Sequence, residues 1–154
     1  MKLFAQETVS SLKPGDVLGL VGELGAGKTT FVQHLAKALG VKSRVNSPTF
    51  LVMRVYKTEE PKNGRTKERD RSSQQKSRIY TLEPRTLTLV HIDAYRLKDS
   101  RDLETLGATE YIGAPNTITV IEWADRVKSA LPKHTRWIHL FHGEKQGERV
   151  VVLK

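Results

Sequence analysis

One stretch of the sequence combines glycine, lysine and threonine at the spacing of a phosphate-binding loop. It reads Gly22-Glu23-Leu24-Gly25-Ala26-Gly27-Lys28-Thr29 and fits the pattern of glycine, four free positions, glycine, lysine and a hydroxyl residue. The glycines let successive backbone N–H groups turn toward an anion, and the lysine supplies a mobile cation for the outer phosphates. The threonine hydroxyl is a ligand for Mg²⁺. The stretch therefore predicts a site for nucleotide phosphates and Mg²⁺.

Three further polar residues follow apolar or turn-forming segments at places where ligands collect in α/β proteins. Asp93 closes the apolar run that begins at Leu87, Glu122 closes the run that begins at Thr117, and Thr49 lies in a Ser-Pro-Thr turn. In open parallel sheets, ligands bind beyond the carboxyl ends of the strands. Asp93 is accordingly a candidate Mg²⁺ ligand, with a turn-capping or helix-capping aspartate as the alternative.

Glu122 and Thr49 are open to more than one interpretation. The Glu122 carboxylate can orient an attacking water, accept its proton or share the metal, and a salt-bridged glutamate at a strand end is the alternative. Thr49 can sense the γ-phosphate or Mg²⁺ as switch loops do, although Ser-Pro-Thr is also an ordinary turn.

Three other side chains near these positions are weaker candidates. His91 alternates with Asp93 and Tyr95, and a packed or hydrogen-bonded histidine is favoured over a catalyst because phosphate-loop hydrolysis needs no histidine. Arg96 can contact phosphate, pair with Glu104 or face solvent. For Trp123, core packing is favoured over stacking on a partner.

The elements beside the loop are those that must position it. Val17–Val21 is short and apolar, as expected of a central parallel strand. After the loop, Phe31, Leu35 and Leu39 recur every four residues, which indicates an amphipathic helix ending at Gly40. This order predicts an α/β fold, a P-loop NTPase-like mixed and mostly parallel sheet flanked by helices.

The remaining segments complete this prediction. Residues 50–56 and 87–93 are expected to be strands that form an extended hairpin, and 117–122 a strand parallel to the second of them. Short helices are expected over 3–12, over 99–106 and over 123–131. Residues 137–142 and 148–153 are expected to form a C-terminal antiparallel hairpin.

Length, cysteine content and charge bound the class of protein. The 154 residues, without cysteine, predict a single domain of residues 1–154, and the absence of a long apolar run leads us to expect a cytoplasmic protein with no membrane partner. The formal charge is +9, and nearly half of the excess falls in the segment from Lys57 to Thr86. We interpret residues 57–85 as a polar insertion that is solvated and mobile, with an RNA-contacting arm or a lid over the nucleotide as alternatives.

Five blocks taken together resemble the TsaE (YjeE) family of small bacterial ATPases, which are required for making threonylcarbamoyladenosine in tRNA. The blocks are residues 22–30, Ser-Pro-Thr-Phe at 47–50, His-Ile-Asp-Ala-Tyr-Arg-Leu at 91–97, Leu-Gly-Ala-Thr-Glu-Tyr at 106–111 and Ile-Glu-Trp at 121–123. They occur in the family's order between about Pro14 and Pro132. The segment before the first strand is shorter than is usual in the family, and the connection at 57–85 is longer.

The resemblance implies an ATP- and Mg²⁺-dependent ATPase that acts with the TsaB and TsaD proteins, and with tRNA only through their complex. It implies that residues 47–50 form a switch, that Asp93 is the acidic motif and that Glu122 is a metal-linked glutamate essential for activity. The candidate nucleotide-binding residues are Gly22, Glu23, Leu24, Gly25, Ala26, Gly27, Lys28, Thr29, Thr30 and Thr49; the candidate catalytic residues are Lys28, Asp93 and Glu122; the candidate metal ligands are Thr29, Asp93 and Glu122.

Two other functions remain open from the sequence. One is a small-molecule kinase in which the basic segment 57–85 forms a lid, and the other is a basic RNA-binding module. A GTPase is disfavoured because no Asn-Lys-x-Asp guanine signature occurs in the chain.

Overall fold

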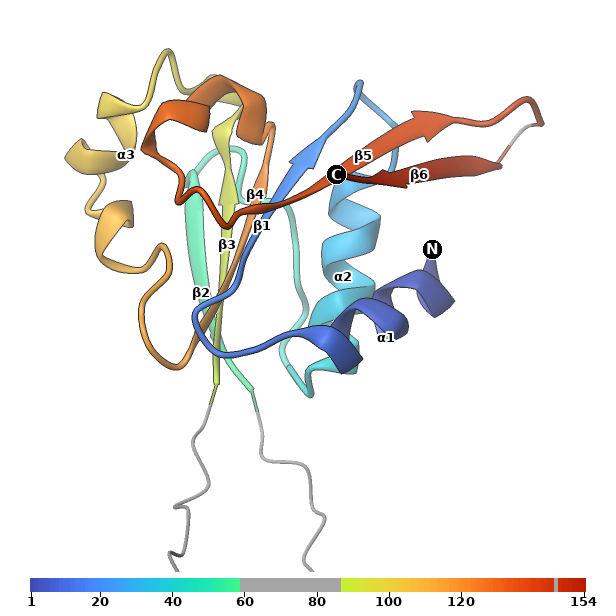
Figure 1. Cartoon of the computed structure of the whole chain (residues 1–154), viewed down its shortest axis with the longest axis horizontal. Coiled ribbons are helices and arrows are strands. Elements are labelled where there is room, and N and C mark those ends of the chain that lie inside the picture. Colours follow the sequence, from blue (N-terminus) through green and yellow to red (C-terminus); the bar gives the residue numbers. More distant parts are fainter. Residues whose placement is uncertain (59–86, 146) are drawn as a thin grey trace, which may run out of the picture.

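The computed structural model describes residues 1–58, 87–145 and 147–154. In these ranges six strands form one sheet in the order β2-β3-β4-β1-β5-β6 (Figure 1). Their bounds are Val17–Val21 for β1, Met53–Lys57 for β2, Thr88–Asp93 for β3, Thr117–Glu122 for β4, Arg136–His142 for β5 and Arg149–Leu153 for β6. The four inner strands are parallel, and both edge strands run antiparallel to their neighbours. The predicted mixed sheet with a C-terminal hairpin is confirmed.

Helices cover both faces of the sheet. Helices α1 (Lys2–Ser11) and α2 (Lys28–Ala38) lie together on one face, and α3 (Arg101–Thr105) lies on the other (Figure 1). Three 3₁₀ segments accompany α3: η1 (Ala94–Arg96), η2 (Ala108–Glu110) and η3 (Ala124–Ala130). The sheet is therefore buried on both sides, which explains why its central strands are almost continuously apolar.

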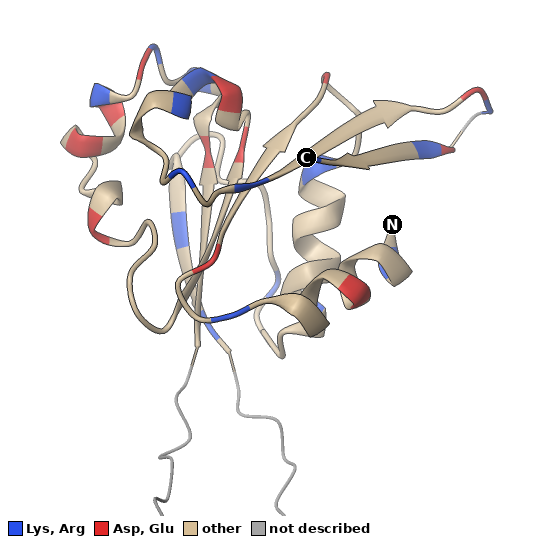
Figure 2. Ribbon diagram, in the orientation of Figure 1, with Lys and Arg blue, Asp and Glu red and all other residues tan. Residues whose placement is uncertain are grey.

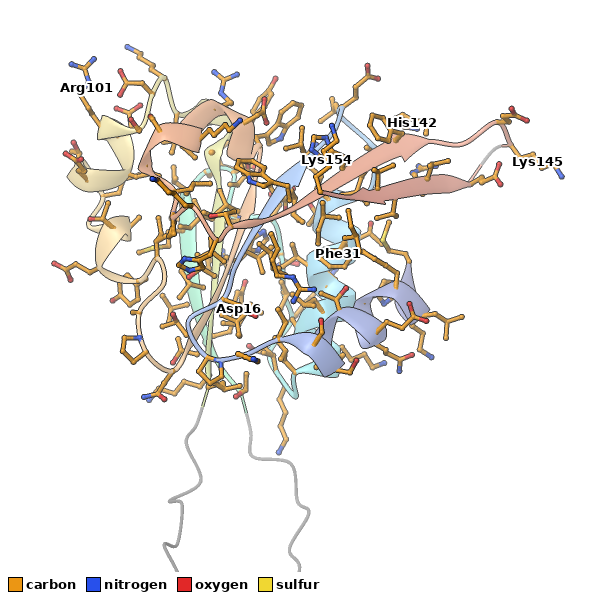
Figure 3. All side chains as sticks on the ribbon, in the orientation of Figure 1. Asp16, Phe31, Arg101, His142, Lys145 and Lys154 are labelled. Carbon is orange, nitrogen blue, oxygen red and sulfur yellow. The ribbon has the colours of Figure 1, made fainter. Side chains whose placement is uncertain are left out.

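Two apolar layers hold the elements that flank the glycine-rich loop. Leu18 and Leu20 of β1 point into the layer beneath α1 and α2. Phe31 of α2, which is labelled in Figure 3, packs in this layer against Phe4, with ring centroids 5.3 Å apart. Val17 points into the opposite layer. Each fully buried side chain of this size contributes about 1.5–3 kcal/mol. Both ends of the loop are therefore anchored in the core.

The parallel register brings the two predicted acidic residues together. Asp93 at the end of β3 lies directly opposite Glu122 at the end of β4, and Leu20 of β1 lies opposite Glu122 on the other side. Because parallel strands end at the same edge, the glycine-rich loop after β1 meets both carboxylates there.

Two predicted elements differ from the observed ones. The strand predicted over 50–56 begins only at Met53, because the chain turns after Pro48 and Val52 adopts a left-handed φ of 63°. The helix predicted over 123–131 consists of 3₁₀ turns with a kink at Val127. Both segments lie beside the candidate site, where the backbone leaves regular structure.

The proposed insertion at 57–85 lies almost entirely outside the described residues, as do its alternatives as an arm or a lid. In the described part, Lys, Arg, Asp and Glu are mixed around α3 and η3, so that this side offers no large field of one sign (Figure 2). Within the same ranges, no helix has the length and apolar character needed to cross a membrane.

Candidate functional site

The glycine-rich loop joins the end of β1 to the first turn of α2 and depends on glycine at two points. At Gly22 an added Cβ would collide with the carbonyl oxygen of Leu140, and Gly27 has a left-handed φ of 99° as the residue that caps α2. A residue with a side chain is strained at either point. The loop therefore leads its backbone N–H groups into the N-terminus of an eleven-residue helix, where anions are stabilised.

Lys28 is held rigidly at the base of the loop. Its Nζ donates to the carbonyl oxygens of Gly22 and Glu23 over 2.6 and 2.9 Å, and the side chain is 5% exposed. The Trp123 ring covers the same ammonium, with Nζ 3.7 Å from the ring centroid. Because an ammonium has three donors, one remains for an anion in the adjoining cavity.

Two opposing effects act on the pKa of Lys28. Burial lowers the pKa of Lys28, and the carboxylates of Glu122, Asp93 and Asp125 act in the opposite direction. A phosphate beside the ammonium would add a further anion and favour its charged form.

Asp93 ties the segment around Thr49 to the end of β3. Its Oδ2 accepts hydrogen bonds from the hydroxyls of Thr49 and Ser47 over 2.6 and 2.9 Å, and Oδ1 accepts from the backbone N–H of Tyr95 over 3.0 Å. The capping alternative is therefore confirmed for Oδ1, while Oδ2 binds the hydroxyls of Ser47 and Thr49. One carboxylate performs both tasks because its two oxygens point to different segments.

Glu122 connects the glycine-rich loop to β3. Its Oε2 accepts a hydrogen bond from the Thr29 hydroxyl over 2.9 Å, and its Oε1 lies 2.8 Å from His91 Nε2. The Glu122 side chain is 3% exposed and the His91 side chain is fully buried. The hydrogen-bonded interpretation of His91 is confirmed, and its partner is a candidate catalytic residue.

These groups surround one cavity of about 410 Å³. It is lined by Leu24, Gly25, Gly27, Lys28, Thr29, Thr30, Ser47, Thr49, Asp93, Tyr95, Glu122 and Trp123. Three predicted residues, Gly22, Glu23 and Ala26, do not line it. The first two accept from Lys28, and Ala26 is buried in the core. A volume of this size lies in the range of small-ligand sites.

Two aromatic contacts involve residues considered in the sequence analysis, and the predicted core packing of Trp123 is confirmed. Trp123, at the left-handed φ of 56°, both packs against the core and forms a cavity wall with Tyr95, their ring centroids being 5.2 Å apart. Arg96 is exposed, as its solvent-facing alternative has it, and its guanidinium lies 4.5 Å from the centroid of the Phe50 ring. Phe50 itself is 84% exposed.

The C-terminal hairpin supplies two contacts that sequence reasoning missed. His142, which is labelled in Figure 3, has its Nε2 3.3 Å from the carbonyl oxygen of Leu24. Arg149 donates to the carbonyl oxygen of Gly25 over 3.1 Å. The sequence predicted the hairpin but not its position in the sheet. Because β5 pairs with β1, the hairpin lies beside the glycine-rich loop. With Lys28, these side chains contact the carbonyl oxygens from Gly22 to Gly25, and the backbone N–H of Ala26 also donates to the carbonyl oxygen of Glu23.

The residues present fit Mg²⁺. Thr29, Asp93 and Glu122 supply a hydroxyl and two carboxylates to one cavity, and oxygen ligands are those that Mg²⁺ prefers. Within the described ranges no cluster of three or more His, Cys, Asp or Glu is arranged to hold a metal. A Mg²⁺ ion held by Thr29, Asp93 and Glu122 would complete its coordination with water and substrate phosphate.

Comparison with known proteins gives a consistent result. A family model described as threonylcarbamoyl adenosine biosynthesis protein TsaE matches residues 1–66 and 73–151. The tRNA threonylcarbamoyladenosine biosynthesis protein TsaE of Treponema pallidum is 37% identical over 129 residues, which are 84% of this chain and 75% of that protein. Its Bacillus subtilis counterpart is 35% identical over 132 residues, 86% of this chain, and the match spans only 65% of that longer protein.

A solved structure resembles the whole described fold. The crystal structure of Bacillus subtilis YdiB superposes with a TM-score of 0.65 at 27% sequence identity, covering 99% of this chain and 76% of that chain. The similarity therefore extends from the sequence blocks to the arrangement of the sheet and helices.

Proposed function

This chain belongs to the TsaE family, and we propose that it is a Mg²⁺-dependent ATPase that supports threonylcarbamoyladenosine modification of tRNA together with a TsaB/TsaD complex. The observation that carries the proposal is the meeting of Thr29, Asp93 and Glu122 at one cavity beside the glycine-rich loop. A phosphate-binding loop by itself indicates only which ligand binds. The two carboxylates at the same cavity are groups that can assist hydrolysis of the bound nucleotide.

The loop and Lys28 would bind the phosphates of ATP. Backbone N–H groups at the N-terminus of α2 would donate to the phosphates, and the free donor of Lys28 would add a charge-assisted hydrogen bond. Since Lys28 is already fixed by Gly22 and Glu23, little side-chain entropy is lost when phosphate arrives. This arrangement favours tight binding through few contacts.

Three side chains would hold the metal and the attacking water. Thr29, Asp93 and Glu122 would ligate Mg²⁺ directly or through water, and the ion would neutralise charge that develops on the transferred phosphoryl group. Glu122 would orient the attacking water or accept its proton, since its carboxylate reaches the same cavity as the Thr29 hydroxyl.

The segment from Ser47 to Phe50 would report the state of the nucleotide. Thr49 and Ser47 are bound to Asp93 Oδ2, an oxygen that the metal would also use. A ligand that draws on Asp93 would therefore compete with both hydroxyls and change where this segment lies. Phe50 and Leu51, which are 84% and 62% exposed, follow directly, so that the change would reach a surface available to a partner protein.

Reconstitution of tRNA modification tests the proposal. Purified TsaB, TsaD, tRNA, a threonylcarbamoyl donor and ATP are combined with and without this protein, and modified tRNA is counted per TsaB/TsaD complex. We expect modification to proceed beyond one turnover only when the protein and ATP are both present. Equal multiple-turnover yields with and without the protein would contradict the proposal, and an acceptor-dependent phosphorylated product would favour the kinase alternative.

A further inference from the structure

His91 is a buried histidine whose only described side-chain partner is Glu122. Its side chain is fully buried, and Nε2 lies 2.8 Å from Glu122 Oε1. Burying a polar ring costs free energy unless the ring is hydrogen-bonded. A leucine or valine would fill an apolar position of the strand at a lower cost in free energy. The neighbours of His91 on β3, Leu89 and Val90, are apolar in this way.

The strand register explains why His91 reaches Glu122. On β3, His91 lies opposite Val120 of β4, and Asp93, two residues further, lies opposite Glu122. His91 is thus one step deeper in the sheet than Glu122 and on the face that carries both carboxylates, since side chains alternate along a strand. From this position His91 can hydrogen-bond to Glu122 although it does not line the cavity.

The two oxygens of Glu122 are held by different partners. Thr29 donates to Oε2 over 2.9 Å, and His91 is the described partner of Oε1. If Mg²⁺ takes the Thr29 hydroxyl as a ligand, the contact with Oε2 must rearrange, and His91 then becomes the contact that keeps the carboxylate oriented. His91 Nδ1 is buried and has no hydrogen-bond partner in the described structure, which favours the tautomer with its hydrogen on Nε2, where it can be donated to Glu122.

We propose that His91 is a positioning residue for hydrolysis, which donates from Nε2 to Glu122 Oε1 and fixes the direction in which Glu122 presents its other oxygen to the metal and the attacking water. The proposal rests on the ATPase function proposed above. A carboxylate that is free to rotate would spend only part of its time in the productive orientation, and supporting contacts of this kind typically change metal affinity or activity by about 10- to 100-fold.

Two substitutions of similar size separate positioning from packing. His91→Leu removes the donor and keeps an apolar filling, whereas His91→Gln places an amide N–H near the position of Nε2. We expect His91→Leu to lower kcat for ATP hydrolysis by about 10- to 100-fold, with the Kd for ATP changed less than about threefold. His91→Gln should recover most of kcat, and His139→Leu, which removes a histidine from β5 away from the cavity, should match the wild type.

The measurements are ATP hydrolysis alone and with the partner complex, equilibrium ATP binding, and thermal unfolding of each variant. Equal kcat for His91→Leu and wild type, or equal loss in His91→Gln and His91→Leu at matched folded fraction, would overturn the positioning role. Absence of hydrolysis by the wild type under both conditions would instead contradict the proposed ATPase function.

A spectroscopic measurement on the unaltered protein tests the contact even if the variants fail to fold. Nitrogen-15 NMR of the His91 ring distinguishes the two tautomers. We expect the hydrogen on Nε2. A hydrogen on Nδ1 would overturn the proposal and leave the ATPase function untouched.

Discussion

Replacing Lys28 with alanine will weaken ATP binding about 100-fold. The free donor of the Lys28 ammonium is the only part of this side chain left for phosphate, and losing a charge-assisted hydrogen bond costs about 1.5–3 kcal/mol, where each 1.4 kcal/mol is a factor of ten. Loss of the two contacts with Gly22 and Glu23 will also loosen the loop, which adds to the effect. Titration calorimetry with ATP and Mg²⁺ measures the change in the Kd for ATP.

Two further variants control for other consequences of this change. Lys28→Met keeps the apolar stem that packs below Trp123 and removes only the ammonium, so we expect the same loss of affinity with less effect on stability. Lys37→Ala removes an exposed lysine from the other end of α2 and should bind ATP as the wild type does. ATP affinity in Lys28→Met within threefold of the wild type would show that the ammonium does not bind phosphate.

Glu122→Gln will lower the turnover of ATP by about 10²- to 10³-fold while ATP binding changes much less. Glutamine retains an oxygen and the volume of glutamate, but it cannot accept a proton from water and binds a metal weakly. The buried contacts with His91 and Thr29 can be kept, because an amide offers both an acceptor and a donor. Single-turnover hydrolysis and equilibrium binding separate the two effects.

The size of the binding change in Glu122→Gln distinguishes the roles of this residue. If Glu122 orients the water, kcat falls and the Kd for Mg²⁺-ATP stays within a few-fold of the wild type. If it is mainly a metal ligand, kcat falls, the Kd for Mg²⁺-ATP rises, and higher Mg²⁺ concentrations restore part of the activity. Glu104→Gln, at an exposed position on α3, is the matched control. If Glu122→Gln hydrolyses ATP as fast as the wild type, Glu122 has no role in the reaction.

Local sequence was sufficient to predict the ends of the inner strands. Val17–Val21 and the runs ending at Asp93 and Glu122 are apolar segments closed by a glycine or a carboxylate, and the structure ends β1, β3 and β4 at these points. Their meeting at one edge also followed from the sequence, since parallel strands joined by crossovers end on the same side.

Contacts that depend on tertiary packing were beyond local sequence. The turn at Val52 and the left-handed Trp123 have no glycine to mark them, so strand and helix were extended through residues that leave regular structure. The approach of His142 and Arg149 to the loop requires β5 to pair with β1. The bond between His91 and Glu122 depends on the β3–β4 register, which the sequence leaves open by one residue or more.

The most direct test is the binding of a non-hydrolysable ATP analogue to the wild-type protein, measured by titration calorimetry with Mg²⁺ and again with a chelator. The cavity bounded by Lys28, Thr29, Asp93 and Glu122 predicts one saturable site per chain, with affinity at least about tenfold higher when Mg²⁺ is present. Absence of saturable binding at millimolar analogue, or the same affinity with and without Mg²⁺, would contradict an Mg²⁺-ATP site.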